Sequence, residues 1–123
     1  PRKTMAFEQS VLLAYRKSKA AGEPFPEGVP LLMELTFTFE PPKSWSKARR
    51  EEVIRRGMCP TCRPDLDNLM KGVADALNGV AYKDDGQICY LRKLDQTGAV
   101  IRKQYGRKDN TRVIIETMDK QEG

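Results

Sequence analysis

Hydrophobic and polar residues alternate most regularly between positions 31 and 39. Every odd position in this stretch is Leu, Met or Phe, whereas positions 34, 36 and 38 are Glu or Thr. A period of two predicts a strand with one buried face. Pro41 and Pro42 follow and end the strand, because proline has no N–H to donate to a sheet.

Helical spacing marks three other segments. Apolar residues at 7, 11, 12 and 15 predict a helix from about residue 6 to 20, before Gly22. Ser46 as N-cap and Gly57 as a stop signal bound a short, basic second helix. Apolar residues at 69, 73, 76 and 77 predict a third helix over 69–78, closed by Gly79. The proline-rich stretch 23–30 is expected to be a loop.

The last third of the chain predicts strands. A turn at 83–86 leads into a strand from 87 to about 94, and further strands are expected over 100–105 and 112–118. The whole pattern predicts an α+β fold with a small mixed or antiparallel sheet and two to three helices. The length of 123 residues suits one domain over residues 1–123.

Residue composition narrows the chemistry. The chain contains no His, which excludes histidine acid–base catalysis, Ser-His and Cys-His nucleophiles, and most zinc enzymes. Catalysis must then use carboxylates, Lys, Arg, Tyr or a hard metal ion. The 22 Lys and Arg exceed the 17 Asp and Glu by five. This excess favours an acidic polymer as partner, although a solubilising surface would give the same balance.

The cysteines and the hydropathy indicate a cytoplasmic protein. Three Cys without a secretory segment predict reduced thiols. Cys59 and Cys62 form half of a zinc site, which two chains could complete together; the alternative is an unligated loop. No apolar run approaches the roughly 18 residues of a membrane span.

Charge is unevenly distributed along the chain. Residues 64–85 contain five Asp and two Lys, a net charge of −3, whereas 43–63 and 92–112 each contain seven Lys or Arg and two acidic residues, a net +5. Basic residues can bind phosphates while an acidic segment holds a cation between protein and phosphate. Alternatively, the clustering exists only in the sequence and not in space.

The acidic segment supports two interpretations. Asp65 and Asp67 could cap a helix, or their carboxylates could converge on a divalent cation that offsets their repulsion. Lys71 and Asp75 could form a surface pair, or Lys71 could stabilise charge on a phosphate. Asp85 lies in a turn, and its carboxylate there would complete a metal site.

The same residues carry a family resemblance. The stretches Arg63-Pro-Asp-Leu-Asp-Asn-Leu-Met-Lys71, Asp75-Ala-Leu-Asn-Gly79 and Lys83-Asp-Asp-Gly-Gln-Ile88 resemble the signature of the RusA-type Holliday junction resolvases, and 41–46 resembles phage-borne members. The resemblance implies a homodimeric, Mg²⁺-dependent endonuclease that nicks four-way DNA junctions symmetrically. The resemblance also implies an opening strand, and residues 1–4 look like its tail. We therefore expect that the chain is a trimmed or processed product.

The resulting predictions are specific. The resemblance implies catalytic roles for Asp65, Asp67, Lys71 and Asp85, with the three aspartates as Mg²⁺ ligands. The predicted DNA-binding residues are Lys43, Lys47, Arg49, Arg50 and Arg63 of the first basic segment, together with Lys83 of the acidic segment. Expected partners are branched DNA and a second copy of the chain, in the cytoplasm of a bacterium or a phage host.

The alternatives to this function are a Mg²⁺ nuclease for other branched DNA and a non-catalytic DNA-binding or phage regulatory protein. Trp45 and Tyr82 could stack on bases or be buried.

Overall fold

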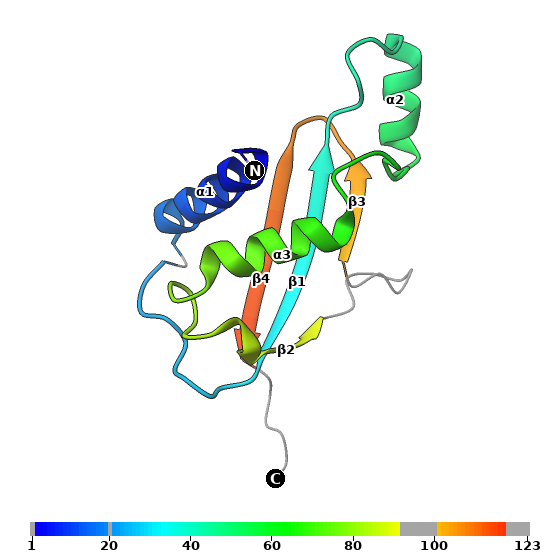
Figure 1. Cartoon of the computed structure of the whole chain (residues 1–123). Helices are drawn as coiled ribbons and strands as arrows, with labels where there is room; N and C mark the ends of the chain where they lie inside the picture. Colours follow the sequence, from blue (N-terminus) through cyan, green and yellow to red (C-terminus); the bar gives the residue numbers. More distant parts are fainter. Residues whose placement is uncertain (1, 20, 92–100, 118–123) are drawn as a thin grey trace.

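The structure, a computed structural model, describes residues 2–19, 21–91 and 101–117. Three helices, a short 3₁₀ turn (η1) and four strands follow one another along the chain (Figure 1). They are α1 (Arg2–Lys17), β1 (Leu31–Phe39), α2 (Lys47–Arg55), α3 (Leu66–Leu77), η1 (Asp85–Gln87), β2 (Ile88–Leu91), β3 (Ile101–Tyr105) and β4 (Asn110–Thr117). The predicted α+β class and the predicted strand over 31–39 are confirmed.

The sheet is built around β1. Along one edge β4 runs antiparallel to it, from the pair Leu31–Thr117 to the pair Thr38–Asn110. The other edge is shared by two parallel strands, β2 beside the start of β1 and β3 beside its end (Figure 1). The sheet is therefore mixed, and β1 has neighbours on both sides along almost its whole length.

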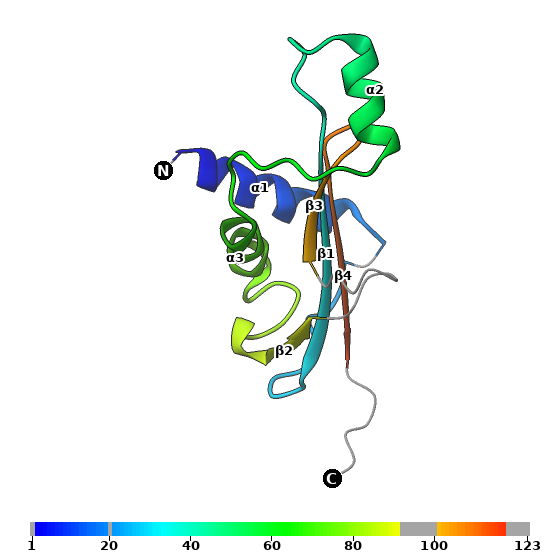
Figure 2. The same ribbon diagram turned by 90° about the vertical axis from the view of Figure 1, so that its right-hand side faces the viewer.

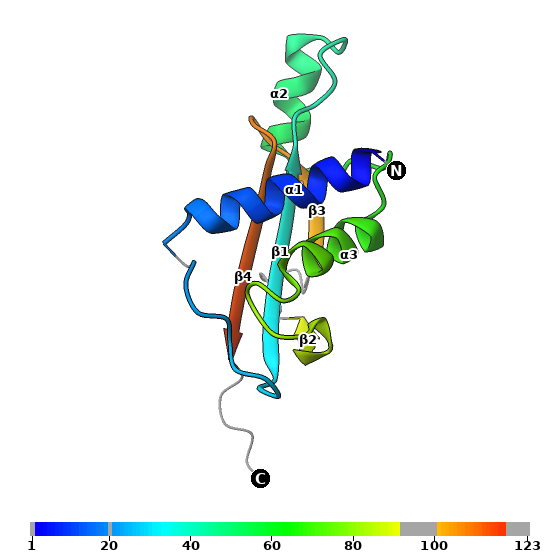
Figure 3. The same ribbon diagram turned by 60° about the vertical axis from the view of Figure 1, so that its left-hand side comes forward.

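The core lies between the sheet and two helices. Figures 2 and 3 show α1 and α3 side by side on one face of the sheet, and no helix covers the other face in the described residues. The odd-numbered residues of β1 up to Phe37 point into this layer and are buried, as are Val73, Leu77 and Tyr82. Each such side chain contributes roughly 1.5–3 kcal/mol through burial. The inward face predicted for the third helix is confirmed.

Glycine allows α1 and α3 to approach closely. A Cβ atom at Gly72 would lie 2.9 Å from the Phe7 ring. Val11 is buried at the same layer, and Phe7 and Tyr15 pack against it. The helical spacing seen at 7, 11 and 15 thus corresponds to the face that α1 presents to the core.

The helix α2 projects beyond the end of β1 and β3 (Figures 1 and 2). The Ser46 hydroxyl accepts a hydrogen bond from the Arg49 N–H at 3.1 Å, which is the predicted N-cap. Gly57 follows the helix with φ +62°, in the left-handed region that favours glycine. Only Val53 of this helix is buried, so most of its charged side chains face solvent.

Several boundaries differ from the prediction. The first helix runs from Arg2 to Lys17 rather than from about 6 to 20, so residues 2–4 are helical and the expectation that they end a strand is wrong. The last strand begins at Asn110 rather than 112. The third helix begins at Leu66 rather than 69, because Asp65 occupies the N-cap position. The strand expected from residue 87 begins at Ile88, since 85–87 form the 3₁₀ turn. Its predicted end at 94, position 100 and position 118 lie outside the described residues.

Candidate active site

Asp65 occupies the N-cap position of α3 without capping the helix. Its backbone is extended, with φ −72° and ψ 150°, but its side chain accepts no capping hydrogen bond. Asp67 lies in the first turn, and its Oδ1 accepts from the Asn68 N–H at 3.0 Å. The capping interpretation therefore does not account for Asp65. Its exposed carboxylate is therefore available to a ligand. The positive end of the helix dipole stabilises the charged carboxylate, and the charged carboxylate can bind a cation.

The same end of α3 opens into a cleft of about 950 Å³. Asp65, Lys71 and Asp75 line it together with Arg63, so carboxylates and cations face one space. Glu8 of α1 and Asp109 of the β3–β4 turn also line this cleft. In the part of the chain that the structure describes, Lys71 and Asp75 do not form the ion pair that a surface role would give.

Asp85 lies at the other end of α3. Its N–H donates to the Asn78 Oδ1 at 3.1 Å, and Asn78 directly follows the helix. Eleven residues separate Asp67 from Asn78, about 16 Å at 1.5 Å per residue. Among the described residues, no three acidic or thiol side chains stand close enough to share a metal ion. The expected convergence of Asp65, Asp67 and Asp85 within one chain is not found, and their roles as ligands stay a prediction.

The turn that carries Asp85 is fixed by its neighbours. The Asp84 Oδ2 accepts from the Gly86 N–H at 2.9 Å, so this carboxylate is engaged in a capping box. The Gln87 Oε1 accepts from the N–H groups of Lys83 and Asp84, both at 3.0 Å. Its Nε2 donates to two carbonyl oxygens of the loop before β1, those of Pro26 and Val29. We assigned Gln87 no role from the sequence, although the Asp-x-x-Gln spacing is a recognisable capping signal.

Tyr82 lies buried beneath α3. Its hydroxyl donates to the Ala74 carbonyl oxygen at 2.8 Å. Burial raises the pKa of Tyr82, and the negative charges of Asp85 and Asp75 raise it further. The phenol therefore stays protonated, and its complete burial excludes the base-stacking role.

Lys103 holds the segment that leads into Asp65. It comes from the helix-facing side of β3, opposite Phe37 of β1. Its Nζ donates to the carbonyl oxygens of Cys62 and Pro64, at 2.8 and 2.9 Å. Sequence reasoning missed this residue. The available signal was a lysine on the core-facing side of a predicted strand, where an apolar residue is usual.

Comparison with known proteins agrees with the motif. The family described as endodeoxyribonuclease RusA matches residues 1–117. The chain belongs to this family. The uncharacterised protein YqaN of Bacillus subtilis (strain 168) is 37% identical over 97 residues, which cover 75% of this chain and 64% of that relative. The match thus spans less than two thirds of the relative's length. No solved structure matches the chain.

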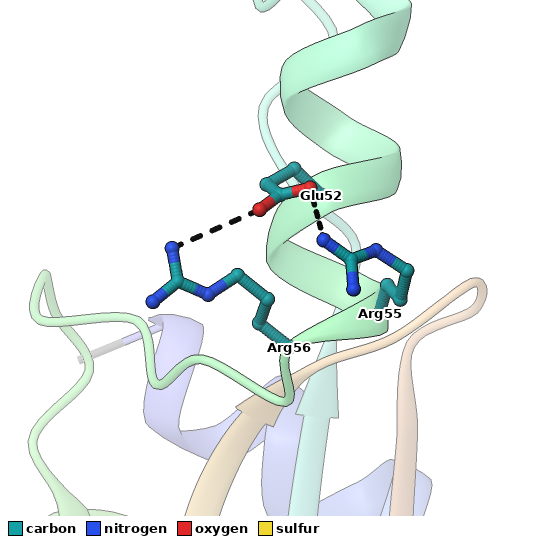
Figure 4. A network of polar contacts seen from close by, with 3 residues as sticks. All are labelled: Glu52, Arg55 and Arg56. Atoms are coloured by element: carbon teal, nitrogen blue, oxygen red, sulfur yellow. Dashed lines mark hydrogen bonds and ion pairs between the residues drawn. The ribbon is translucent and has the colours of Figure 1, made fainter.

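The basic residues of this RusA-family chain are not equivalent. Two arginines at the end of α2 are bound to Glu52, Arg55 at 2.6 Å and Arg56 at 3.7 Å (Figure 4). The hydrogen bond from Arg55 lowers the pKa of Glu52, whose side chain is half-buried. Arg49 instead places its guanidinium 3.6 Å from the ring centre of Trp45, which is half-buried.

The other predicted DNA-binding residues are spread over the molecule. Lys43 precedes α2, Lys47 begins it, Arg63 lines the cleft, and Lys83 precedes the 3₁₀ turn. All four are exposed. The structure therefore places cations near both ends of α3 and along α2, and their contacts with DNA stay a prediction.

The remaining expectations concern metal and membrane. All three cysteines are free and exposed, and Cys59 and Cys62 meet no third metal ligand among the described residues. No described helix has the length and apolar character required to span a bilayer.

Proposed function

We propose that this RusA-family chain forms the catalytic domain of a Mg²⁺-dependent endonuclease that resolves four-way DNA junctions by paired, symmetric nicks. The observation that carries the proposal is the free carboxylate of Asp65 at the start of α3, in one cleft with Lys71 and Arg63. A phosphodiester entering this cleft would meet a carboxylate for the metal and two cations for its own charge.

The oxygen donors at the start of α3 suit Mg²⁺. This ion needs only one or two protein carboxylates, because water and substrate phosphate supply its other ligands. We therefore assign Asp65 and Asp67 as the ligands from this end of the helix. When bound, Mg²⁺ activates a water molecule and stabilises the leaving 3′ oxygen. Lys71 would neutralise charge on the phosphate under attack, and Arg63 would position the strand.

We assign Asp85 to the site from a second copy of the chain. About 16 Å of helix separates Asp67 from Asn78, and Asn78 holds the backbone of Asp85, so a site containing all three aspartates would take Asp85 from a partner protomer. A two-fold axis then creates two such sites, which suits a substrate with two-fold symmetry. The proposed dimer and the proposed three-aspartate site thus support each other.

A cleavage assay tests this function. The protein is incubated with a labelled four-way junction, a flapped duplex and a linear duplex, each with Mg²⁺ or with EDTA. We expect cuts only with Mg²⁺, mainly in the junction. On a plasmid that extrudes a cruciform, paired nicks give a linear product, whereas single nicks give an open circle.

The same assay separates the alternatives. Preferred cutting of the flapped duplex would indicate a nuclease for other branched DNA. Junction binding without cleavage under any divalent cation would indicate a non-catalytic DNA-binding protein, which needs the basic residues but not a free carboxylate beside Lys71.

Lys103 is expected to act as a positioning residue. Lys103→Met removes two charge-assisted hydrogen bonds to the segment before Asp65, each typically worth about 1.5–3 kcal/mol. Single-turnover cleavage should slow by roughly tenfold or more, since a small displacement of a catalytic group is costly. Junction binding in EDTA should change less than twofold.

The matched control is Lys108→Met in the exposed β3–β4 turn, which removes the same charge without a contact to that segment. The Mg²⁺ concentration that gives half-maximal rate should rise for Lys103→Met alone. Equal effects of the two changes on rate and Mg²⁺ dependence would show that Lys103 contributes only charge.

A further inference from the structure

A second cavity, separate from the cleft at α3, lies between α2 and the β3–β4 turn. Its volume is about 470 Å³. Lys47 and Arg50 of α2 and Arg107 of the turn line it, and Glu51 adds one carboxylate, so three positive charges and one negative charge leave a net +2. The remaining wall is largely apolar and consists of Pro41, Trp45, Ile54 and Gly106. We call this cavity the α2 pocket.

Arg50 is the unusual member of the α2 pocket. Its Nε is buried and has no hydrogen-bond partner within the described part of the chain. Other arginines of the same helix are engaged, Arg55 with Glu52 and Arg49 with the Trp45 ring. A buried guanidinium N–H without an acceptor is unfavourable and rare in folded proteins. A turn of the Arg50 side chain toward the cavity that it lines would bring this N–H to an acceptor supplied by a ligand.

We infer that the α2 pocket binds a backbone phosphate of DNA, with Arg50 as its central donor and Lys47 and Arg107 as flanking cations. A guanidinium presents parallel N–H donors that match two phosphate oxygens. The apolar wall lowers the local dielectric constant and strengthens this attraction. The inference rests on the proposed function, which makes DNA the source of the phosphate.

Arg107 is held by one solvent-exposed ion pair. Its Nη2 lies 3.4 Å from the Glu51 Oε2, and the Arg107 side chain is largely exposed while that of Glu51 is about half exposed. Such a pair is weak and screened by salt, so a phosphate can compete for the guanidinium. The pocket also separates Arg49 from Arg50. Arg49 stacks on Trp45 and does not line the cavity, although the sequence made the two arginines look equivalent.

Salt-dependent binding tests this inference. Binding of a fluorescent four-way junction is measured in EDTA, where no cleavage occurs, across a series of KCl concentrations. Arg50→Met should reduce the slope of log K against log salt by about 0.9, which corresponds to about eightfold weaker binding at 0.1 M salt. Its melting temperature should equal or exceed that of the parent, because the buried unpaired N–H is removed.

Arg55→Met is the matched control, because it removes the same charge from the same helix outside the α2 pocket. Its slope should change by less than half as much. Arg107→Met changes an exposed turn residue and should reproduce the Arg50→Met slope even if the latter variant is unstable. The inference is overturned if Arg50→Met and Arg107→Met keep the parent slope, or if Arg55→Met lowers it equally.

The result is separable from the proposed nuclease function. If the parent protein binds junctions through Arg50 but does not cut DNA with Mg²⁺, the phosphate pocket is supported and the nuclease function is contradicted. If the parent protein cuts junctions but its arginine variants keep the parent slope of log K against log salt, the nuclease function is supported and the phosphate pocket is contradicted.

Discussion

Asp67→Asn is expected to slow junction cleavage by roughly a hundredfold to a thousandfold, the range seen when one electrostatic element of an active site is removed. An amide is neutral and a poor ligand for Mg²⁺. Junction binding in EDTA should be kept or become tighter, because a negative charge beside phosphate is lost. Single-turnover cleavage and gel shifts on the same junction measure the two effects separately.

Asp75→Asn provides the control for charge alone. Asp75 belongs to the same helix and lines the cleft together with Asp65, but it is not among the assigned ligands. Its cleavage rate should remain within a few fold of the parent. If Asp67→Asn cuts at the parent rate, the start of α3 is not the metal site. If it instead loses DNA binding, the acidic residues act in folding.

Mixing two inactive variants tests the shared site. In a mixed dimer of Asp67→Asn and Asp85→Asn, one site contains both substitutions and the other contains neither. We expect cleavage to return after subunit exchange, as single nicks rather than paired ones. A mixture of Asp65→Asn and Asp67→Asn should stay inactive, because each site then keeps one damaged ligand. No recovery in the first mixture would mean that Asp85 does not act across a dimer.

Local sequence patterns predicted most of the fold. The alternation at 31–39 identified the central strand because β1 packs one face against helices, whereas no helix among the described residues covers the other face. The inward residues of α3 followed from their spacing, since a helix repeats its face every three or four residues. The start of α3 was predicted three residues too late, because the helix was drawn from the apolar spacing that begins at Leu69, whereas Asp65, considered as a possible cap, occupies the N-cap position.

Long-range relations were not predictable from those patterns. Asp65 and Asp85 belong to one acidic segment, yet α3 holds them at opposite ends, and only the path of the chain reveals this. Lys103 reaches a segment 41 residues away in sequence. Arg50 and Arg107 meet at one cavity from different elements. Motif spacing identifies candidate residues, whereas the packing of elements decides which of them face each other.

The hydrogen-bonding side chain of Gln87 leads to the largest expected loss of stability. Gln87→Leu removes four hydrogen bonds that join the turn before Asp85 to the loop before β1. Each buried group left without a partner costs about 1–3 kcal/mol. Some of the freed groups can bind water, so we expect a loss of roughly 3–5 kcal/mol. That is a large share of the roughly 5–15 kcal/mol by which domains are stable.

Urea denaturation of matched variants measures this loss. Gln104→Leu is the control, because it removes one hydrogen bond, to the Thr38 hydroxyl at 3.2 Å. It should cost about 1 kcal/mol. The urea midpoint should fall for Gln87→Leu while the slope of the transition stays constant, since the surface exposed on unfolding is unchanged. Equal midpoints for the two variants would contradict a structural role for Gln87.

The stability of Gln87→Glu should depend on pH in a way that reports on the same hydrogen bonds. The carboxylate keeps the acceptors for Lys83 and Asp84 but turns negative oxygens toward the carbonyl oxygens of Pro26 and Val29. Burial and these carbonyls raise the folded-state pKa of the new Glu above its usual value of about 4.3. The folded state then holds the proton more tightly than the unfolded state, so the deficit relative to the parent is largest at neutral pH and shrinks as pH falls toward 4. Parent-like stability at pH 7, or a deficit that does not change with pH, would show that the side chain is not held between these carbonyls.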